Sequence, residues 1–241
     1  MTLRRHLQYA VANAQVRTWP YPHIFVRDVF PATFYAWLDR EFNTAPMTQF
    51  NLSGRVGKAY PSTRDIWALA PGAGDLWDEL HDALLGDGAF CETLLAVTFA
   101  EFYRRRFPQN PPTVTDEVLV TRDHDTFALG PHTDSPVKVA TALFYVPRTY
   151  KLDAKSGPVE VTQQAALGTS LYVPRDPAFR CPGSLHHART NFDLVHTAPY
   201  LPNSMFAFFK TDNSFHGVEP VQSAEPRRLL IYDVRVAKSG G

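Results

Sequence analysis

The stretch GPHTDSPVKVATALFYVP, residues 130–147, contains a strong strand signal next to a pair of polar side chains. Its second half is an apolar run rich in β-branched and aromatic residues, bounded by Pro136 and Pro147, and such runs are typical of buried strands. Just before the run, His132 and Asp134 are two positions apart, so in an extended chain their side chains point the same way. The stretch therefore predicts a buried strand preceded by two candidate metal ligands. The spacing alone does not distinguish such ligands from a polar turn.

Similar short apolar runs fill the second half of the chain. They are EVLVTR, GTSLYVP, SMFAFF and RRLLIYDVRV, each bounded by Pro, Gly, Asp or Asn. Twenty prolines and 17 phenylalanines also favour many short strands over a helix bundle.

The first half carries helical periodicity instead. Apolar residues recur at helical spacing after Pro31 and after Asp75, and the segment at 88–108 predicts a third helix that ends at Pro108. Helices followed by antiparallel strands predict an α+β fold in which a sandwich or jelly-roll barrel forms the catalytic half and the helices pack on one sheet. We expect one domain over 1–241, mainly helical over 1–112 and jelly-roll over 113–237, although two domains are compatible with the length.

The composition narrows the class of partner and the compartment. Lys and Arg balance Asp and Glu at 24 each, so nothing draws the chain generally to nucleic acid or to an anionic membrane. Two cysteines do not make a disulfide framework, and no run of residues reads as a signal peptide or a membrane span. The sequence therefore predicts a cytoplasmic protein with a small or locally recognised partner.

A later stretch, KTDNSFHGVEPVQSAEPRRLLIYDVRV at 210–236, supplies a third candidate ligand, His216. Two histidines and one carboxylate, His132, Asp134 and His216, are the set that binds iron(II) on one face of an octahedron and leaves three positions open.

With GPHTDSP, KVATALFYVP, FHGVEPV and RRLLIYDV, residues 115–236 resemble the iron(II)- and 2-oxoglutarate-dependent oxygenases, in particular the prolyl-4-hydroxylase-like branch. The resemblance implies a double-stranded β-helix of the jelly-roll or cupin type. It also implies that His132, Asp134 and His216 bind iron, and that Arg227 or Arg228 binds the far carboxylate of 2-oxoglutarate. We favour Arg227; an inward-facing Arg228 would align instead with Leu230, Tyr232 and Val234.

The reaction implied by the resemblance is hydroxylation of an unactivated C–H bond, with 2-oxoglutarate converted to succinate and carbon dioxide. Dioxygen is the oxidant, and ascorbate is a further candidate cofactor. The substrate class is a small molecule, an amino acid or a peptidyl residue. Since related halogenases have a small residue at the position of Asp134, its presence favours hydroxylation or desaturation.

Other residues are candidate pocket groups. Arg122 and Tyr145 lie on strands neighbouring the metal segment, and we expect them to line the co-substrate pocket. Lys138 is either a pocket cation or, as we prefer, an edge-strand charge that discourages aggregation. The segments 147–158 and 174–192 have loop composition and are expected at the mouth of the barrel. The adjacent His186 and His187 would face opposite ways and make a poor second metal site.

Two rival functions remain open at this point. One is a jelly-roll protein that binds a metal or a sugar without redox turnover, and the other is a cupin-like isomerase. Neither needs a co-substrate anchor shortly after His216, so the arginine there favours the oxygenase.

Overall fold

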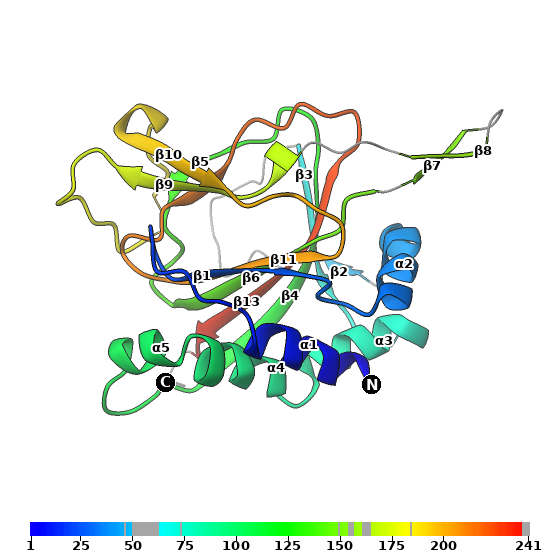
Figure 1. Ribbon diagram of the computed structural model, residues 1–241, viewed down its shortest axis with the longest axis horizontal. Coiled ribbons are helices and arrows are strands. Elements are labelled where there is room, and N and C mark those ends of the chain that lie inside the picture. The colour runs from blue at the N-terminus through cyan, green and yellow to red at the C-terminus, as the bar shows by residue number, and fades with distance from the viewer. Residues whose placement is uncertain are drawn as a thin grey trace.

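The computed structural model describes residues 1–45, 47–49, 63–72, 74–148, 150–153, 157–160, 165–183 and 185–237, and combines helices with antiparallel sheets (Figure 1). The large sheet has seven strands in the order β1-β11-β6-β13-β4-β3-β2. In that order the strands are β1 His23–Arg27, β11 Ser204–Phe209, β6 Lys138–Tyr145, β13 Arg227–Val236, β4 Val114–Asp123, β3 Arg64–Leu69 and β2 Met47–Gln49.

A smaller sheet of four strands lies over one face of the large sheet (Figure 1). Its strands, in spatial order, are β10 Phe192–Thr197, β9 Ser170–Pro174, β12 His216–Val218 and β5 Leu129–His132. Side chains from both sheets form one inner core, to which Leu171 and Val218 contribute from the small sheet and Phe206 and Leu229 from the large one. The two sheets therefore enclose a packed interior into which inward-facing side chains project.

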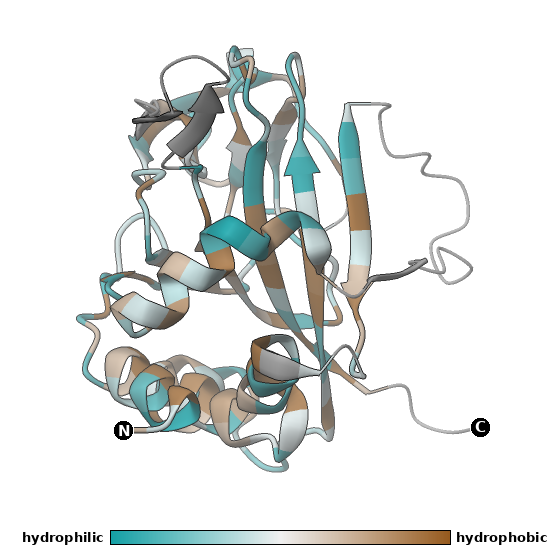
Figure 2. Cartoon of the chain, turned by 90° about the vertical axis from the view of Figure 1, so that its right-hand side faces the viewer, coloured by the Kyte–Doolittle hydropathy of each residue, from teal (hydrophilic) through white to brown (hydrophobic). Residues whose placement is uncertain are grey.

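The helices cover the opposite face of the large sheet (Figures 1 and 2). They are α1 Leu3–Ala12, α2 Ala32–Glu41, α3 Asp75–His81, α4 Ala89–Glu92 and α5 Ala100–Arg106. A second core joins them to the outward-facing side chains of the sheet, among them Val120, Phe144 and Leu230. The expected packing of N-terminal helices on one sheet is thus observed in the described residues.

The first half of the chain is less purely helical than its sequence predicts. Three of its segments, β1, β2 and β3, are strands that extend the large sheet at both ends. The segment at 88–108 is also not one regular helix, because the π-helical segment Thr93–Thr98 separates α4 from α5. Its apolar side chains are buried as expected, Leu95 and Phe99 among them.

The expected loop at 147–158 contains strand structure. It carries β7 Tyr150–Asp153 and the start of β8 Gly157–Glu160, which pair as a two-stranded hairpin. Residue 149 and residues 154–156 of this segment lie outside the described residues.

Strand alternation sorts the side chains of the large sheet between the two cores. On β13, Leu229 and Ile231 enter the inner core, whereas Leu230 and Tyr232 enter the helix-side core. Because successive residues of a strand face opposite ways, this register decides which arginine of the pair at 227–228 can reach the interior.

Candidate metal centre and co-substrate pocket

His132, Asp134 and His216 converge between the two sheets. His132 ends β5 and lies directly opposite His216, the first residue of β12, in the register of that strand pair. Ligand atoms of the three residues all lie within 4.8 Å of one another, and the Nε2 atom of His216 is 4.0 Å from Oδ2 of Asp134. Metal–ligand bonds of about 2 Å require such atoms to come within about 3 Å of one another, so small side-chain rotations suffice to close the set on one ion.

Backbone carbonyls orient both imidazoles. Nδ1 of His132 lies 2.9 Å from the carbonyl oxygen of Gly130, and Nδ1 of His216 lies 2.9 Å from that of Ser214. A carbonyl only accepts hydrogen bonds, so each Nδ1 carries the proton and each Nε2 keeps a lone pair for a metal. The donor set and its tautomers fit a divalent transition metal such as iron(II).

The protonation states suit the same role. Burial lowers the pKa of His132 well below its ordinary value, and the neighbouring His216 lowers it further. Burial also lowers the pKa of His216, although Asp134 opposes that shift. Burial disfavours the charge on Asp134, but Lys138 and the two histidines outweigh it and hold the pKa of this carboxyl well below its usual range. The imidazoles are therefore neutral and the carboxylate is ionised near neutral pH, as metal ligation requires.

A buried polar cluster holds the carboxylate of Asp134 in place. The Nζ atom of Lys138 lies 3.1 Å from Oδ1 of Asp134 and 2.7 Å from Oδ1 of Asp233. The hydroxyl of Thr141 is within hydrogen-bond distance of both carboxylates, at 3.0 and 2.8 Å. Our preferred sequence interpretation of Lys138 was therefore wrong: β6 lies inside the sheet, between β11 and β13, and Lys138 is a pocket cation.

Arg227 points into the space between the sheets and lines the same cavity as the three candidate ligands. Its side chain is 1% exposed, and its Nη1 donates to Oδ2 of Asp123 at 2.6 Å. Tyr145 lies beside it, with the ring centroid 5.6 Å from the guanidinium carbon. The Tyr145 hydroxyl donates to Oγ1 of Thr169 at 2.8 Å and accepts from the Thr169 backbone N–H at 3.0 Å. Both residues thus occupy the interior, as the favoured strand register requires.

Arg228 and Arg122 lie on the other face of the large sheet, where they are partners in the β13–β4 register. Arg228 donates to the carbonyl oxygen of Val146 at 3.0 Å and pairs with Asp39 of α2. Arg122 stacks over the ring of Trp67, 4.7 Å from its centroid. The expectation that Arg122 lines the co-substrate pocket does not hold. Side chains alternate along β4, and that of Arg122 faces the helices rather than the space between the sheets.

Two residues at this end of the site were missed in the sequence: Arg64, which lines the cavity, and its carboxylate partner Asp123. Asp123 is fully buried at the end of β4, and Arg64 of β3 lies opposite it in the strand register. Nη2 of Arg64 donates to Oδ2 of Asp123 at 2.9 Å, and Nε donates to the other carboxylate oxygen. The available signal was alternation along β4, which places Asp123 on the same face as the buried Leu119 and Thr121.

The segment 174–192 packs directly against the metal segment. The hydroxyl of Thr133 donates to the carbonyl oxygen of Cys181 at 2.9 Å. Gly183 has φ of +142°, and a Cβ atom there would lie 2.1 Å from the carbonyl oxygen of Asp134, so only glycine fits this approach. Residue 184 of this segment lies outside the described residues.

The two adjacent histidines in this segment do face different surroundings. The ring of His186 stacks on the ring of His132 at 4.5 Å between centroids. The ring of His187 instead packs among aromatic residues, including Phe179 and Phe192. His186 is thus a neighbour of the candidate metal centre that the sequence did not indicate.

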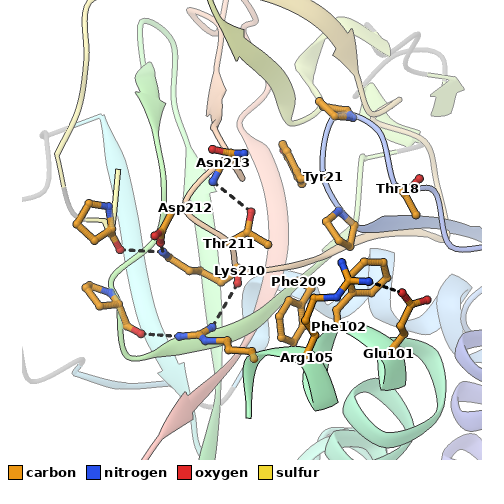
Figure 3. Close-up of a pocket in the computed structure, with 15 residues that line it drawn as sticks. Thr18, Tyr21, Glu101, Phe102, Arg105, Phe209, Lys210, Thr211, Asp212 and Asn213 are labelled. Carbon is orange, nitrogen blue, oxygen red and sulfur yellow. Dashed lines mark hydrogen bonds and ion pairs between the residues drawn. The ribbon is translucent and has the colours of Figure 1, made fainter. Parts of the chain in front are cut away.

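A larger groove of about 710 Å³ lies between α5, the segment at 18–22 and the loop after β11 (Figure 3). Two of its cations bind backbone carbonyls: Arg106 donates to Pro136 at 2.7 Å and to Lys138 at 2.8 Å, and Nζ of Lys210 donates to Pro182 at 2.8 Å. The groove contains none of the three candidate ligands. Its basic side chains instead bind the backbone of the segment after Asp134 and of the segment at Pro182.

Solved structures similar to this chain include prolyl hydroxylases. A prolyl-4-hydroxylase from Pseudomonas putida superposes with a TM-score of 0.53 at 14% identity, covering 96% of this chain and 99% of that one. A prolyl hydroxylase from Trichoplax adhaerens, in complex with a hypoxia-inducible factor peptide fragment, gives a TM-score of 0.54 at 10% identity and covers 97% of this chain and 90% of its own. The chain has the fold of these oxygenases.

The likeness is one of structure rather than of sequence. No protein-family model matches the chain, and no curated protein matches it by sequence. A third prolyl 4-hydroxylase, from Phytophthora capsici, gives a TM-score of 0.51 at 16% identity and covers 99% of this chain and 67% of its own. Among the described residues, no helix is both long enough and apolar enough to cross a membrane.

Proposed function

We propose that this protein is an iron(II)- and 2-oxoglutarate-dependent dioxygenase that hydroxylates an unactivated C–H bond and releases succinate and carbon dioxide. The observation that carries the proposal is the convergence of His132, Asp134 and His216 in a cavity that Arg227 also lines. The fold of prolyl hydroxylases supports it. The proposal includes a double-stranded β-helix core at 113–237 within one domain, and a cytoplasmic location.

In this proposal His132, Asp134 and His216 hold the ion, and Arg227 with Tyr145 holds the far carboxylate of 2-oxoglutarate. The ferrous ion and its co-substrate supply the oxidising chemistry when they are bound. Lys138 and Thr141 keep the carboxylate of Asp134 aimed at the ion, because each contacts it from behind. A guanidinium suits a carboxylate since its planar fork donates two charge-assisted hydrogen bonds.

Apolar side chains shield the proposed site from water. Phe208 packs against the His216 ring at 4.5 Å between centroids, and Leu143 and Ile231 also line the cavity. A dry surrounding strengthens the interactions that hold a charged co-substrate and excludes side reactions with water. The protein's share of the chemistry is therefore binding, orientation and shielding.

The oxidised substrate is proposed as a small molecule, an amino acid or a peptidyl residue. The Trichoplax enzyme binds a peptide, which supports keeping peptides in this set. Screening such candidates for stimulated succinate release, in air with iron(II) and 2-oxoglutarate, tests the proposal. His216→Ala should release no succinate, and His196→Ala, which changes an exposed histidine of β10, should match the parent protein. Metal binding without succinate release from any candidate would favour the non-redox binding protein or isomerase.

A further inference from the structure

The carboxylate of Asp123 lies between two guanidinium groups that line the cavity. Nη1 of Arg227 donates to its Oδ2 at 2.6 Å, and Nη2 of Arg64 donates to the same oxygen at 2.9 Å. All three side chains are almost fully buried, with exposures of 1% for Arg227, 6% for Arg64 and 0% for Asp123. We infer that Arg64 supplies the net positive charge that binds the far carboxylate of 2-oxoglutarate, an inference that rests on the proposed function.

The inference follows from the net charge of the groups around Asp123. Arg227 alone would be neutralised by Asp123, and a neutral pair has little attraction for an incoming anion. Arg64 adds a second positive charge to the same carboxylate, so the three groups together carry +1. In a buried setting such an unbalanced charge is costly in the empty protein and is compensated when an anion binds.

The charges around the candidate metal ligands complement those around Arg227. Asp134, Asp233 and Lys138 sum to −1. Arg235 also contacts Asp233, but it is paired with Glu117 and leaves this sum unchanged. A divalent cation brings the metal end to +1. The two ends then each carry +1, and the two carboxylates of 2-oxoglutarate carry one negative charge each.

The position of Arg64 fits a binding role. Arg64 and Arg227 both line the cavity that the candidate metal ligands line. The guanidinium carbon of Arg64 lies 4.1 Å from the ring centroid of Phe127, so the side chain is held from one face by a cation–π contact.

A purely structural role is the competing explanation, in which Arg64 only ties β3 to β4. A second substitution that restores the net positive charge separates the two roles. If net charge governs co-substrate binding, Arg64→Gln weakens it and adding Asp123→Asn to that variant recovers it, because Arg227 then carries an unneutralised charge. If the ion pair is only structural, the second substitution adds damage. Arg122→Gln is the matched control. Arg122 is next to Asp123 on β4 but faces the other side of the sheet, so this variant removes one positive charge outside the cavity.

The experiment is calorimetric titration of 2-oxoglutarate into the manganese(II)-loaded protein, with manganese stoichiometry and thermal unfolding measured for each variant. Arg64→Gln should weaken 2-oxoglutarate binding by about tenfold or more, as expected for losing a charge-assisted contact. Arg64→Lys should retain most of the affinity, Arg122→Gln all of it, and Arg64→Gln/Asp123→Asn should return to within a few-fold of the parent.

Two results would overturn the inference: unchanged affinity in Arg64→Gln, or a double variant that binds more weakly than Arg64→Gln. Either leaves the proposed function intact, provided that the parent protein binds 2-oxoglutarate. If the parent protein binds manganese but not 2-oxoglutarate, the proposed function and this inference both fail. If Arg64→Gln does not fold, Asp123→Asn alone tests the inference: it raises the net charge of the three groups from +1 to +2 and should tighten 2-oxoglutarate binding, whereas weaker binding would overturn the inference.

Discussion

His132 and His216 face each other across the β5–β12 strand pair, with their ring centroids 4.4 Å apart. Residues far apart in the sequence thus meet through strand register, and Asp134 joins them from the turn after β5. The carbonyl of Gly130 orients one ring and that of Ser214 the other, so both rings present Nε2 to the same point.

Removing either imidazole should abolish binding of one ferrous or manganese ion per chain. His132→Ala and His216→Ala each leave two ligands, which is too few to hold the ion against water at micromolar concentrations. Metal stoichiometry after gel filtration measures this. A variant of either histidine that keeps a full equivalent of tightly bound metal would show that the ion binds elsewhere.

Lys138→Met should destabilise the metal-free protein by about 3–5 kcal/mol, because it leaves two buried carboxylates without their shared cation. Added divalent metal should then raise the unfolding temperature more in this variant than in the parent. Arg175→Met is the control, since Arg175 and its carboxylate partner Asp193 are both largely exposed. Equal destabilisation by both substitutions, measured by urea unfolding, would contradict the role given to Lys138.

Arg227→Gln should weaken 2-oxoglutarate binding strongly and leave metal affinity nearly unchanged. Arg228→Gln should lower stability, because it loses the contact with Asp39 of α2, but should not change co-substrate affinity. Titration of both variants with 2-oxoglutarate makes the comparison. The reverse pattern would mean that the register of β13 in solution differs from the one described.

The metal-free protein should lose stability on mild acidification. Both candidate ligand histidines have a pKa below 6.5 in the folded state, so the unfolded chain binds more protons as the pH falls below that value. Unfolding free energy should therefore be highest above about pH 6.5 and fall as the pH drops toward the folded pKa values. Replacing both histidines by alanine should flatten this part of the pH profile measured by urea unfolding. An unchanged slope would assign the dependence to other groups.

The strands of the second half could be predicted from the sequence because they depend on local patterns, whereas the three candidate ligands were indicated by the order of distant motifs and by the family resemblance. The run at 138–146 is apolar throughout, and β6 is buried along its whole length. The offset from His216 favoured Arg227 over Arg228, whereas alternation along the strand left Arg228 open as the inward residue. The role of each of these residues remains a prediction.

The supporting residues could not be predicted, because they depend on contacts between distant strands. Arg64 meets Asp123 only through the pairing of β3 with β4, and β3 itself was hidden within a half of the chain dominated by helical periodicity. Lys138 looked like an edge charge because nothing local indicates that β11 covers one side of its strand and β13 the other. Buried charges are recognisable only once their partners are known.

The most direct test of the central claim is anaerobic addition of iron(II) and then 2-oxoglutarate to the metal-free protein, followed by visible absorption. We expect a weak band that requires both additions, is absent from His216→Ala and is retained by His196→Ala. Admitting air should bleach the band and yield succinate. No band in the parent protein, with no succinate after exposure to air, would contradict the assignment of this cavity to iron and 2-oxoglutarate.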